Sequence, residues 1–305
     1  MKMLIIGGSG MIGTKIYEHF YKKNNVEMTY LTHKIPFGNN HKLDILQKED
    51  TINLIQKTNP DVVVHNTALV SVDLCETDKK LADSINVEGT KNVIEGCKLT
   101  NSKIVFISTP LVFNGEKDEY VETDKPSPIS HYGVTKLEGE ELIKKSGLPY
   151  LILRTDQPYC WIENWQHTNS VLRLVDTLKE KKILREITDW YNNPTYVPDI
   201  AIVIDKLLEN KKIGIYHVVG ADFINRFEWG LITSELFQLD KKLLEPITSD
   251  SLNLAVKRSN ANLSNQKLVQ EIGFSPKGVR EGIQQMLKDK KNRTVKSTLL
   301  SKTKN

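Results

Sequence analysis

A tyrosine and a lysine stand four positions apart in the segment SHYGVTKLEGEE, as Tyr132 and Lys136. Because residues four apart share one face of a helix, the two side chains can serve one site. A tyrosine hydroxyl has an ordinary pKa of about 10, and a neighbouring ammonium lowers that pKa by favouring the phenolate. The pair therefore predicts a tyrosine that exchanges a proton at neutral pH, beside a lysine that can also bind the ribose hydroxyls of a cofactor.

A hydroxyl that holds the substrate oxygen would complete such a centre. Ser108 and Thr109 come at the end of the apolar run KIVFIS, which predicts a buried strand over 103–108. Open α/β sheets bind their ligands at the carboxyl ends of strands, where these two hydroxyls are expected. A YxxxK pair alone also fits an ordinary surface helix with a partly buried tyrosine. Its combination with strand-end hydroxyls and a glycine loop favours catalysis.

The amino-terminal segment IIGGSGMIGTKI carries glycines in a GxxGxxG pattern, at Gly7, Gly10 and Gly13. The pattern follows the first predicted strand and opens the first predicted helix, so the turn must be tight and its backbone must approach a ligand closely. A helix amino terminus presents N–H groups and positive potential to a pyrophosphate. We therefore expect a dinucleotide to bind here, over the three glycines, Met11 and Ile12.

The end of the second predicted strand bears on the choice of dinucleotide. It reads YLTHK, and Thr32, His33 and Lys34 include no acid that could accept hydrogen bonds from the ribose of NAD. A hydroxyl, an imidazole and an ammonium suit a 2′-phosphate better, so NADP is favoured and NAD is the alternative. A solvated loop charge is the alternative interpretation of Lys34. Asp44 and Ile45, in HKLDIL, are expected near the adenine.

Short apolar runs alternate with longer helical patterns along the first half of the chain. Near-continuous β-branched runs predict buried strands, because helices cover both faces of a parallel sheet. The alternation predicts an α/β fold, a doubly wound parallel Rossmann sheet with helices on both faces. The expected strands are 2–7, 27–32, 61–66, 103–108, 150–154 and 214–220, and the expected helices between them are 11–23, 46–58, 78–99 and 132–146.

The pattern loosens after about residue 155, which indicates a smaller, partly interleaved carboxyl-terminal substrate lobe. We expect residues 1–155 to form the NAD(P)-binding domain and 156–290 the substrate-binding lobe, with a strand and helices of 195–220 returning to the sheet. Residues 291–305 are expected to be a disordered basic tail. Further helices are expected at 169–182, 198–210, 226–238, 264–272 and 278–289.

Composition and charge exclude several classes of protein. The 305 residues carry a net charge of +4, much of it in the carboxyl-terminal KDKKNRTVKSTLLSKTKN, so no nucleic-acid partner is expected. No apolar run approaches the roughly 18 residues of a membrane span, and neither a signal peptide nor a membrane partner is expected. The three cysteines, Cys75, Cys97 and Cys160, are scattered, which predicts reduced thiols in a cytoplasmic protein and no metal site.

Several motifs in a fixed order resemble the extended short-chain dehydrogenase/reductases, and most of all the dTDP-4-dehydrorhamnose reductase family of nucleotide-sugar reductases. The resemblance covers roughly residues 1–290. GGSGMIG is similar to the family's cofactor loop, VVHNTALVSVDLCE to its Asn-Ala-Ala segment, and FISTPLVFNG with YVETDKPSPISHYGVTKLEGE to its longest signature. NNPTYVPDIA, GIYHVVGADFINRFEWG and KRSNANLSNQKL resemble its later blocks.

The resemblance implies an NADP-dependent reductase of a nucleotide-diphosphate 4-keto-6-deoxysugar, acting in polysaccharide biosynthesis. Thr109, Tyr132 and Lys136 would be catalytic, with Tyr132 as proton donor to the keto oxygen and the nicotinamide as hydride source. Thr109 would orient the carbonyl, and Ser108 is the less favoured alternative. By resemblance, Asn66, Thr67, Ala68, Asn86 and Ser108 are expected beside the cofactor, and Val70, Phe113, Arg258 and Asn262 beside the substrate.

Three stretches depart from the family's pattern. In the carboxyl-terminal segment, Arg258 is followed by Ser259 where the family has proline. The family continues Ser-Thr with Asp-Tyr, whereas this chain has Pro110 and Leu111, which removes an acid and a hydroxyl near the reacting sugar. The loop TDQPYCWIENWQHTN has no counterpart that we recognise. Its candidates for binding a base or a sugar are Asp156, Tyr159, Trp161 and Trp165, and packing is the alternative role for the aromatic side chains of this loop.

Two other functions stay open. A nucleotide-sugar epimerase or dehydratase is one, although dehydratases commonly carry an acid beside the triad hydroxyl and Pro110 and Leu111 supply none. A non-catalytic NADP-binding regulatory subunit is the other, and the presence of Thr109, Tyr132 and Lys136 favours catalysis over it. The expected partner is a small-molecule nucleotide sugar, and family analogy suggests a homodimer.

Overall fold

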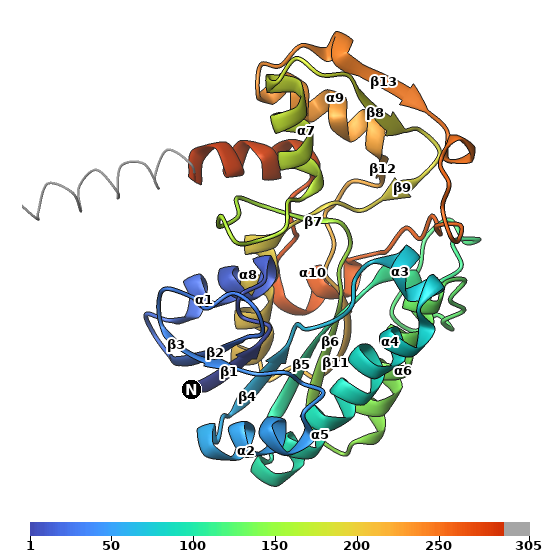
Figure 1. The fold of residues 1–305 in the computed structure, drawn as a ribbon. Coiled ribbons are helices and arrows are strands. Elements are labelled where there is room, and N and C mark those ends of the chain that lie inside the picture. The colour runs from blue at the N-terminus through green and yellow to red at the C-terminus, as the bar shows by residue number, and fades with distance from the viewer. Residues whose placement is uncertain (290–305) are drawn as a thin grey trace, which may run out of the picture.

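A computed structural model describes residues 1–289, and the predicted basic tail at 291–305 lies outside the described residues. Within them, seven parallel strands form the main sheet, in the order β11-β6-β5-β4-β1-β2-β3 (Figure 1). The chain winds outward in both directions from β1 and β4, and a doubly wound sheet leaves a ligand crevice at this switch point. The strands are β1 (Lys2–Ile6), β2 (Asn25–Tyr30), β3 (Asn39–Lys42), β4 (Val62–His65), β5 (Lys103–Ser108), β6 (Tyr150–Arg154) and β11 (Gly214–His217).

Both faces of this sheet are apolar. Along β1, Met3 and Ile5 pack on one face and Leu4 and Ile6 on the other, and all four side chains are buried. Successive side chains of a strand point to opposite faces, so such a strand needs a helical layer on each side. The predicted doubly wound α/β fold is therefore confirmed.

Helices cover the two faces in two layers. One layer contains α1 and α8, which pack against each other, and the other contains α2 and α5, which do the same (Figure 1). The first layer is α1 (Met11–Phe20), α8 (Val197–Glu209) and α10 (Gln266–Ile272), and the second is α2 (Lys48–Thr58), α5 (Gly89–Thr100) and α6 (His131–Lys145).

Three local elements differ from those expected. Strand β3 reads NNHK, and it had no apolar pattern to predict it because it forms the polar edge of the sheet beside β2. The single helix expected at 78–99 is divided into α4 (Lys79–Asp83), a π-helical turn (Ser84–Glu88) and α5. Helix α3 (Val72–Thr77) was not expected, and Ser71 caps it by accepting a hydrogen bond from Leu74 N at 3.3 Å.

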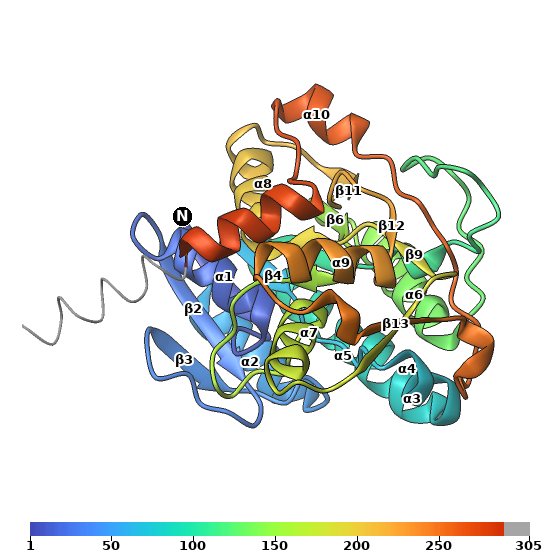
Figure 2. The same ribbon diagram turned by 90° about the horizontal axis from the view of Figure 1, so that it is seen from above.

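A smaller group of elements lies above the carboxyl edge of the sheet (Figure 1). It has its own apolar core, with Leu172, Trp229, Leu244 and Ile283 among the buried side chains. From above, the helix at 279–289 runs beside α9 (Figure 2). The elements are α7 (Ser170–Lys179), β8 (Leu184–Ile187), α9 (Arg226–Leu236) and β13 (Leu244–Ile247), with short pairs formed by β7 (Pro158–Tyr159) with β10 (Thr195–Tyr196) and β9 (Tyr191–Asn192) with β12 (Ile224–Asn225).

The exact division of the chain into two domains stays a prediction. Strand β11 pairs with β6 at the end of the main sheet, and α8 packs on α1, so two elements from late in the chain belong to the sheet's own layers. Across residues 1–289, no helix has both the length and the apolar character needed to cross a bilayer.

Candidate active site

The turn between β1 and α1 accepts only glycine at its tightest points. Gly7 adopts a φ of +83°, and a β-carbon at Gly13 would lie 2.5 Å from the Gly7 carbonyl oxygen. Helix α1 begins at Met11, and its N-cap residue, Gly10, has no side chain that could accept hydrogen bonds from the first turn. The amide N–H groups of that turn are therefore directed beyond the helix, which suits the pyrophosphate of a dinucleotide.

Two adjoining cavities, of about 320 and 560 Å³, open along this turn. Ser9, Gly10 and Thr32 line both, so the cavities form one elongated cleft at the carboxyl edge of the sheet. Most residues predicted to bind the cofactor lie there. The smaller cavity is lined by Gly7, Gly10, Thr32, Asp44, Ile45, Asn66, Thr67 and Ala68, and the larger one by Gly10, Met11, Thr32 and His33, among others.

The other predicted cofactor residues, Gly13, Tyr132 and Lys136 among them, lie outside these linings. Ile12 is partly buried against the helical layers, and Lys34 is exposed. Asn86 and Ser108 are buried behind the cleft, at 2% and 4% exposure. These residues can support the cleft, but they do not form its surface.

Tyr132 lies in the first turn of α6. Ser130 caps this helix by accepting a hydrogen bond from Gly133 N at 3.2 Å. The adjacent 3-10 turn packs so closely that a β-carbon at Gly133 would lie 2.1 Å from the Leu111 carbonyl oxygen. This close approach brings Thr109, at the end of β5, to the Tyr132 phenol, with which it is hydrogen-bonded. The structure thus joins two of the three residues predicted to be catalytic.

The pKa of the Tyr132 phenol is raised, whereas the sequence led us to expect a lowered value. The side chain is 9% exposed and packs against Cys75 and Ala82. Burial is the main cause of the raised pKa, Cys75 adds to it, and the hydrogen bond with Thr109 opposes it. Desolvation disfavours a phenolate and outweighs any nearby ammonium. At neutral pH the Tyr132 phenol therefore keeps its proton.

Lys136 follows Tyr132 by one helical turn and is 3% exposed. Its Nζ donates a hydrogen bond to the Ile107 carbonyl oxygen at 2.8 Å and lies 3.9 Å from the centroid of the Phe106 ring. Burial lowers the pKa of Lys136 to about 7, and Glu140 opposes this change. An ammonium carries three hydrogens, so the bond to Ile107 leaves Lys136 able to donate to a ribose hydroxyl as well.

Ser108 has a different partner from Thr109. Its hydroxyl donates to Glu140 Oε1 at 2.6 Å, and Glu140 is in turn held by Arg154 of β6. The Ser108 hydroxyl hydrogen is therefore engaged in a hydrogen bond with the buried Glu140–Arg154 ion pair. Thr109 is left as the hydroxyl that faces Tyr132, and its catalytic role stays a prediction.

Asn86 connects the cleft to the helix that carries Tyr132. Its Oδ1 accepts from Leu69 N at 2.7 Å, while its Nδ2 donates to Leu69 O at 3.2 Å and to Thr135 Oγ1 at 2.9 Å. Leu69 directly follows Ala68 of the cleft lining, and Thr135 belongs to α6. The π-helical turn places Asn86 between them, a use typical of such turns at functional sites.

The six residues predicted to bind substrate do not all come together. Val70 lines the larger cavity and is 69% exposed. Asp156 is buried and accepts a hydrogen bond from Asn193 N at 2.8 Å. Phe113 is fully buried and stacks on Tyr120 with 4.3 Å between ring centroids, so it is a packing residue.

Trp161, Arg258 and Asn262 lie outside the larger cavity. Trp161 Nε1 donates to Met286 O at 2.6 Å, and the indole lines a separate cavity beside α1 and α8. Arg258 forms an ion pair with Asp73 at 2.5 Å at a further cavity of about 540 Å³. Asn262 donates to Asp118 O at 3.1 Å, which fixes a loop.

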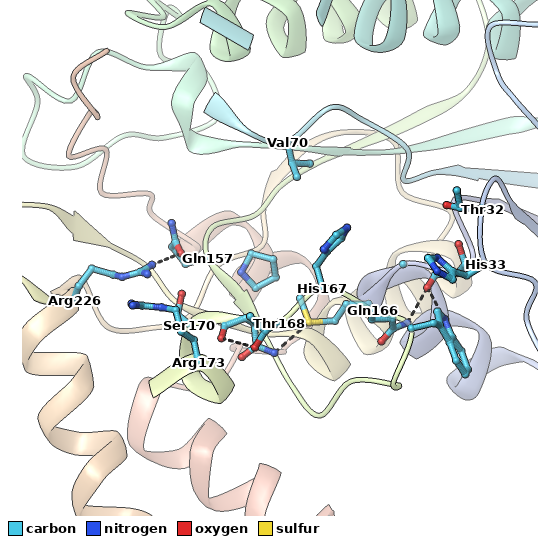
Figure 3. A pocket seen from close by; sticks show the side chains of 16 residues that line it. Thr32, His33, Val70, Gln157, Gln166, His167, Thr168, Ser170, Arg173 and Arg226 are labelled. Carbon is cyan, nitrogen blue, oxygen red and sulfur yellow. Dashed lines mark hydrogen bonds between the residues drawn. The ribbon is translucent and has the colours of Figure 1, made fainter. Parts of the chain in front are cut away.

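The larger cavity contains Trp165, a candidate from the sequence, together with residues that the sequence did not reveal (Figure 3). Gln166 Nε2 donates to Ser9 O at 2.9 Å and to Thr14 Oγ1 at 2.8 Å, and Trp165 Nε1 donates to Ser9 O at 3.2 Å. These bonds hold the loop before α7 against the glycine turn. The remaining unpredicted lining residues are Gln157, Pro158, His167, Thr168, Asn169, Ser170, Arg173 and Arg226.

A family model described as the RmlD substrate binding domain matches residues 1–292. The chain belongs to this RmlD family. Its 289-residue alignment with dTDP-4-dehydrorhamnose reductase of Aggregatibacter actinomycetemcomitans is 29% identical and covers 90% of this chain and 94% of that protein. The chain is also 27% identical to methionine adenosyltransferase 2 subunit beta of Mus musculus over 303 residues, or 95% of this chain and 89% of that one.

This RmlD-family chain also resembles solved structures over almost its full length. The dTDP-4-dehydrorhamnose reductase of Bacillus anthracis, solved in complex with NADP, matches with a TM-score of 0.84 and 26% identity, covering 94% of this chain and 99% of that one. The similarity therefore includes both the sheet and the elements above its carboxyl edge. Among the described residues, no group of three or more His, Cys, Asp or Glu side chains is placed to hold a metal ion.

Proposed function

We propose that this protein is an NADP-dependent reductase of the 4-keto group of a nucleotide-diphosphate 6-deoxysugar. One observation carries the proposal: a Tyr132 that stays protonated is hydrogen-bonded to Thr109, and its helix α6 is linked through Asn86 to Leu69, which directly follows Ala68 of the cleft lining. Two relatives support it, since one is a dTDP-4-dehydrorhamnose reductase by name and another reductase of this name was solved with NADP. A cytoplasmic location and a homodimer stay predictions.

The residues of the cleft fit NADP. The uncapped first turn of α1 suits the pyrophosphate, and the smaller cavity, with Asp44 and Ile45 in its lining, has room for the adenosine. Thr32 and His33 line the larger cavity and offer a hydroxyl and an imidazole to a 2′-phosphate. Lys136, with ammonium hydrogens beyond the one bonded to Ile107, is the residue that would hold the nicotinamide ribose.

When bound, the cofactor supplies a hydride to the keto carbon of the sugar. Tyr132 donates its phenolic proton to the keto oxygen, which becomes the product hydroxyl. Thr109 donates a hydrogen bond that orients this oxygen toward the phenol, and Lys136 stabilises the phenolate left behind. The buried position of Tyr132 keeps bulk water from exchanging with that proton.

A regulatory subunit is the second candidate, because the similarity to methionine adenosyltransferase 2 subunit beta covers 95% of the chain. Such a protein could keep the cleft for binding NADP without using it for turnover. The hydrogen bond between Thr109 and the protonated Tyr132 favours the enzyme, since binding alone does not require a proton donor there.

The deciding experiment offers the purified full-length protein NADPH and a panel of nucleotide-linked 4-keto-6-deoxysugars. Loss of reduced-nicotinamide absorbance is followed, and the product is identified by mass spectrometry. We expect oxidation of NADPH with at least one sugar and a gain of two hydrogens in that sugar. Tight NADPH binding without oxidation by any sugar would replace this proposal with the regulatory one.

A further inference from the structure

Arg173 and Arg226 lie at the end of the larger cavity opposite Thr32 and His33 (Figure 3). Their guanidinium groups share one carboxylate, that of Glu186. Arg173 of α7 pairs through Nη2 with Glu186 Oε1, and Arg226 of α9 lies with its Nε 3.6 Å from Glu186 Oε2. The three residues come from three different elements, α7, β8 and α9. The packing of the upper elements is therefore what brings them together.

Arg226 is held rigidly in this position. Its Nη1 donates to Gln157 Oε1 at 2.7 Å, a contact visible in Figure 3. Its Cζ lies 5.8 Å from the ring centroids of both Trp190 and Trp229, so two aromatic side chains help to hold the guanidinium. A guanidinium fixed in this way loses little conformational freedom when it binds a ligand.

The described side chains that line the cavity include basic residues but no acidic ones. Its lining contains Arg173, Arg226, His33 and His167, and among the described residues that line it there is no carboxylate. Glu186 sits behind the surface, with a side chain only 6% exposed, and its single charge faces two cations. Glu186 therefore balances only one of the two positive charges at this end of the cavity.

Asp156 is the other carboxyl group near Arg226. It accepts hydrogen bonds from Asn193 N and from the Asn192 side chain, and burial raises its pKa to about 7. Asp156 therefore cancels the positive charge only in part at neutral pH, and less as the pH falls. It does not belong to the cavity lining, so it does not compete for a ligand by direct contact.

We infer that Arg173 and Arg226 form the binding site for the diphosphate of the nucleotide sugar. This inference rests on the proposed function, because it assumes that the sugar nucleotide occupies the same cleft as the cofactor. The pyrophosphate of NADP belongs at the start of α1, whereas this second site lies beside the start of α7, where Asn169 and Ser170 also line the cavity. Planar guanidinium groups bind phosphate oxygens through pairs of N–H donors, which a lysine cannot do.

The test uses calorimetric titration of the full-length protein saturated with NADP⁺, so that the cofactor site cannot take up the probe. The probes are thymidine diphosphate, uridine diphosphate and inorganic pyrophosphate, with thymidine as the probe that lacks phosphate. We expect Arg226→Gln and Arg173→Gln each to weaken diphosphate binding about tenfold or more, as loss of a charge-assisted hydrogen bond should. Arg185→Gln is the matched control, because Arg185 is exposed on the same strand as Glu186 and pairs with Glu245.

Glu186→Gln should change the diphosphate affinity in the opposite direction from the two arginine substitutions. Removing the shared carboxylate frees both guanidinium groups, so diphosphate should bind several-fold more tightly, while NADPH affinity stays unchanged. A purely structural ion triad predicts the reverse, since every substitution in it would then loosen the cavity and weaken binding. The sign of the Glu186→Gln effect thus separates ligand recognition from packing, even where one arginine variant folds poorly.

Unchanged diphosphate affinity in both arginine variants would overturn the inference, as would equal losses for thymidine. Failure of the proposed function looks different. If no keto sugar oxidises NADPH but diphosphates bind with the expected variant pattern, the site stands and the reductase does not. If a keto sugar is reduced and Arg226→Gln leaves its KM unchanged, the reductase stands and the site does not.

Discussion

Glu140 and Arg154 form a two-pronged ion pair inside the protein, with Arg154 Nε and Nη2 donating to the two Glu140 oxygens at 3.0 and 2.7 Å. Neither side chain is more than 2% exposed. Glu140 follows Lys136 by one turn of α6, and Arg154 ends β6. The pair therefore fixes the helix that carries Tyr132 and Lys136 to the carboxyl edge of the sheet.

Breaking this pair should destabilise the protein strongly. Glu140→Gln leaves the Arg154 charge buried without its counter-ion, a change that typically costs about 3–5 kcal/mol of unfolding free energy. Denaturation in urea measures the loss. The double variant Glu140→Met with Arg154→Met should lose less than either single variant, because it removes both buried charges. Equal unfolding free energies for Glu140→Gln and the unmodified protein would contradict the assigned role.

Tyr132→Phe should abolish most turnover and leave NADPH affinity intact. The substitution removes the one hydroxyl hydrogen that the mechanism transfers, and general acid catalysis contributes about 10²–10⁴-fold to rate. Single-turnover kinetics and fluorescence titration with NADPH measure the two quantities. Tyr21→Phe is the control, since Tyr21 is 45% exposed at the end of α1. A Tyr132→Phe protein with full kcat would remove the phenol from the chemistry.

Cofactor binding should weaken as the pH rises through about 7. Burial lowers the pKa of Lys136 to about 7 from the usual range near 10.5, so the ammonium predominates below that pH and the neutral amine above it. Lys136 donates to the ribose more strongly as an ammonium, and NADPH affinity should therefore fall on the alkaline side. Titrations of NADPH from pH 6 to about 9 check this. A fall that persists unchanged in Lys136→Met would belong to another group.

The strands of the sheet could be predicted because each buried strand is a short run of apolar residues. KMLII, VVVH and KIVFIS are apolar on both faces, which only a central parallel strand requires. The strand NNHK escaped prediction because backbone pairing with β2, and not apolar burial, holds it in place. The π-helical turn at Asn86 was missed for a related reason, since its bonds reach Leu69 and Thr135, far away in the chain.

The candidate site was predictable where one motif places a residue directly. Thr109 follows its strand and Tyr132 opens its helix, so both positions could be inferred from neighbouring residues. The raised pKa of Tyr132 could not, because Cys75 and Ala82, which bury it, come from segments more than 45 residues earlier. The pairing of Glu186 with Arg226 likewise depends on how β8 and α9 pack, so no pattern of neighbouring residues could predict it.

Two glycines of the first turn should respond differently to alanine. At Gly13 a β-carbon would lie 2.5 Å from Gly7 O and 2.7 Å from Gly8 Cα, so Gly13→Ala must distort the turn. At Gly10 the nearest atom would be 3.3 Å away and the backbone φ is −73°, which alanine adopts readily. Gly10 nevertheless lines both cavities, so its new methyl group would occupy space meant for the pyrophosphate.

We therefore expect Gly13→Ala to lower both the unfolding free energy and NADPH affinity. Gly10→Ala, whose tight contact with Gly7 O needs only a small shift, should lower chiefly NADPH affinity. Thermal unfolding without cofactor gives the first quantity and fluorescence titration the second. The contrast is informative because both substitutions add the same methyl group three residues apart. If Gly10→Ala bound NADPH as tightly as the unmodified protein, the pyrophosphate would have to lie elsewhere, since the uncapped start of α1 could not then be in contact with it.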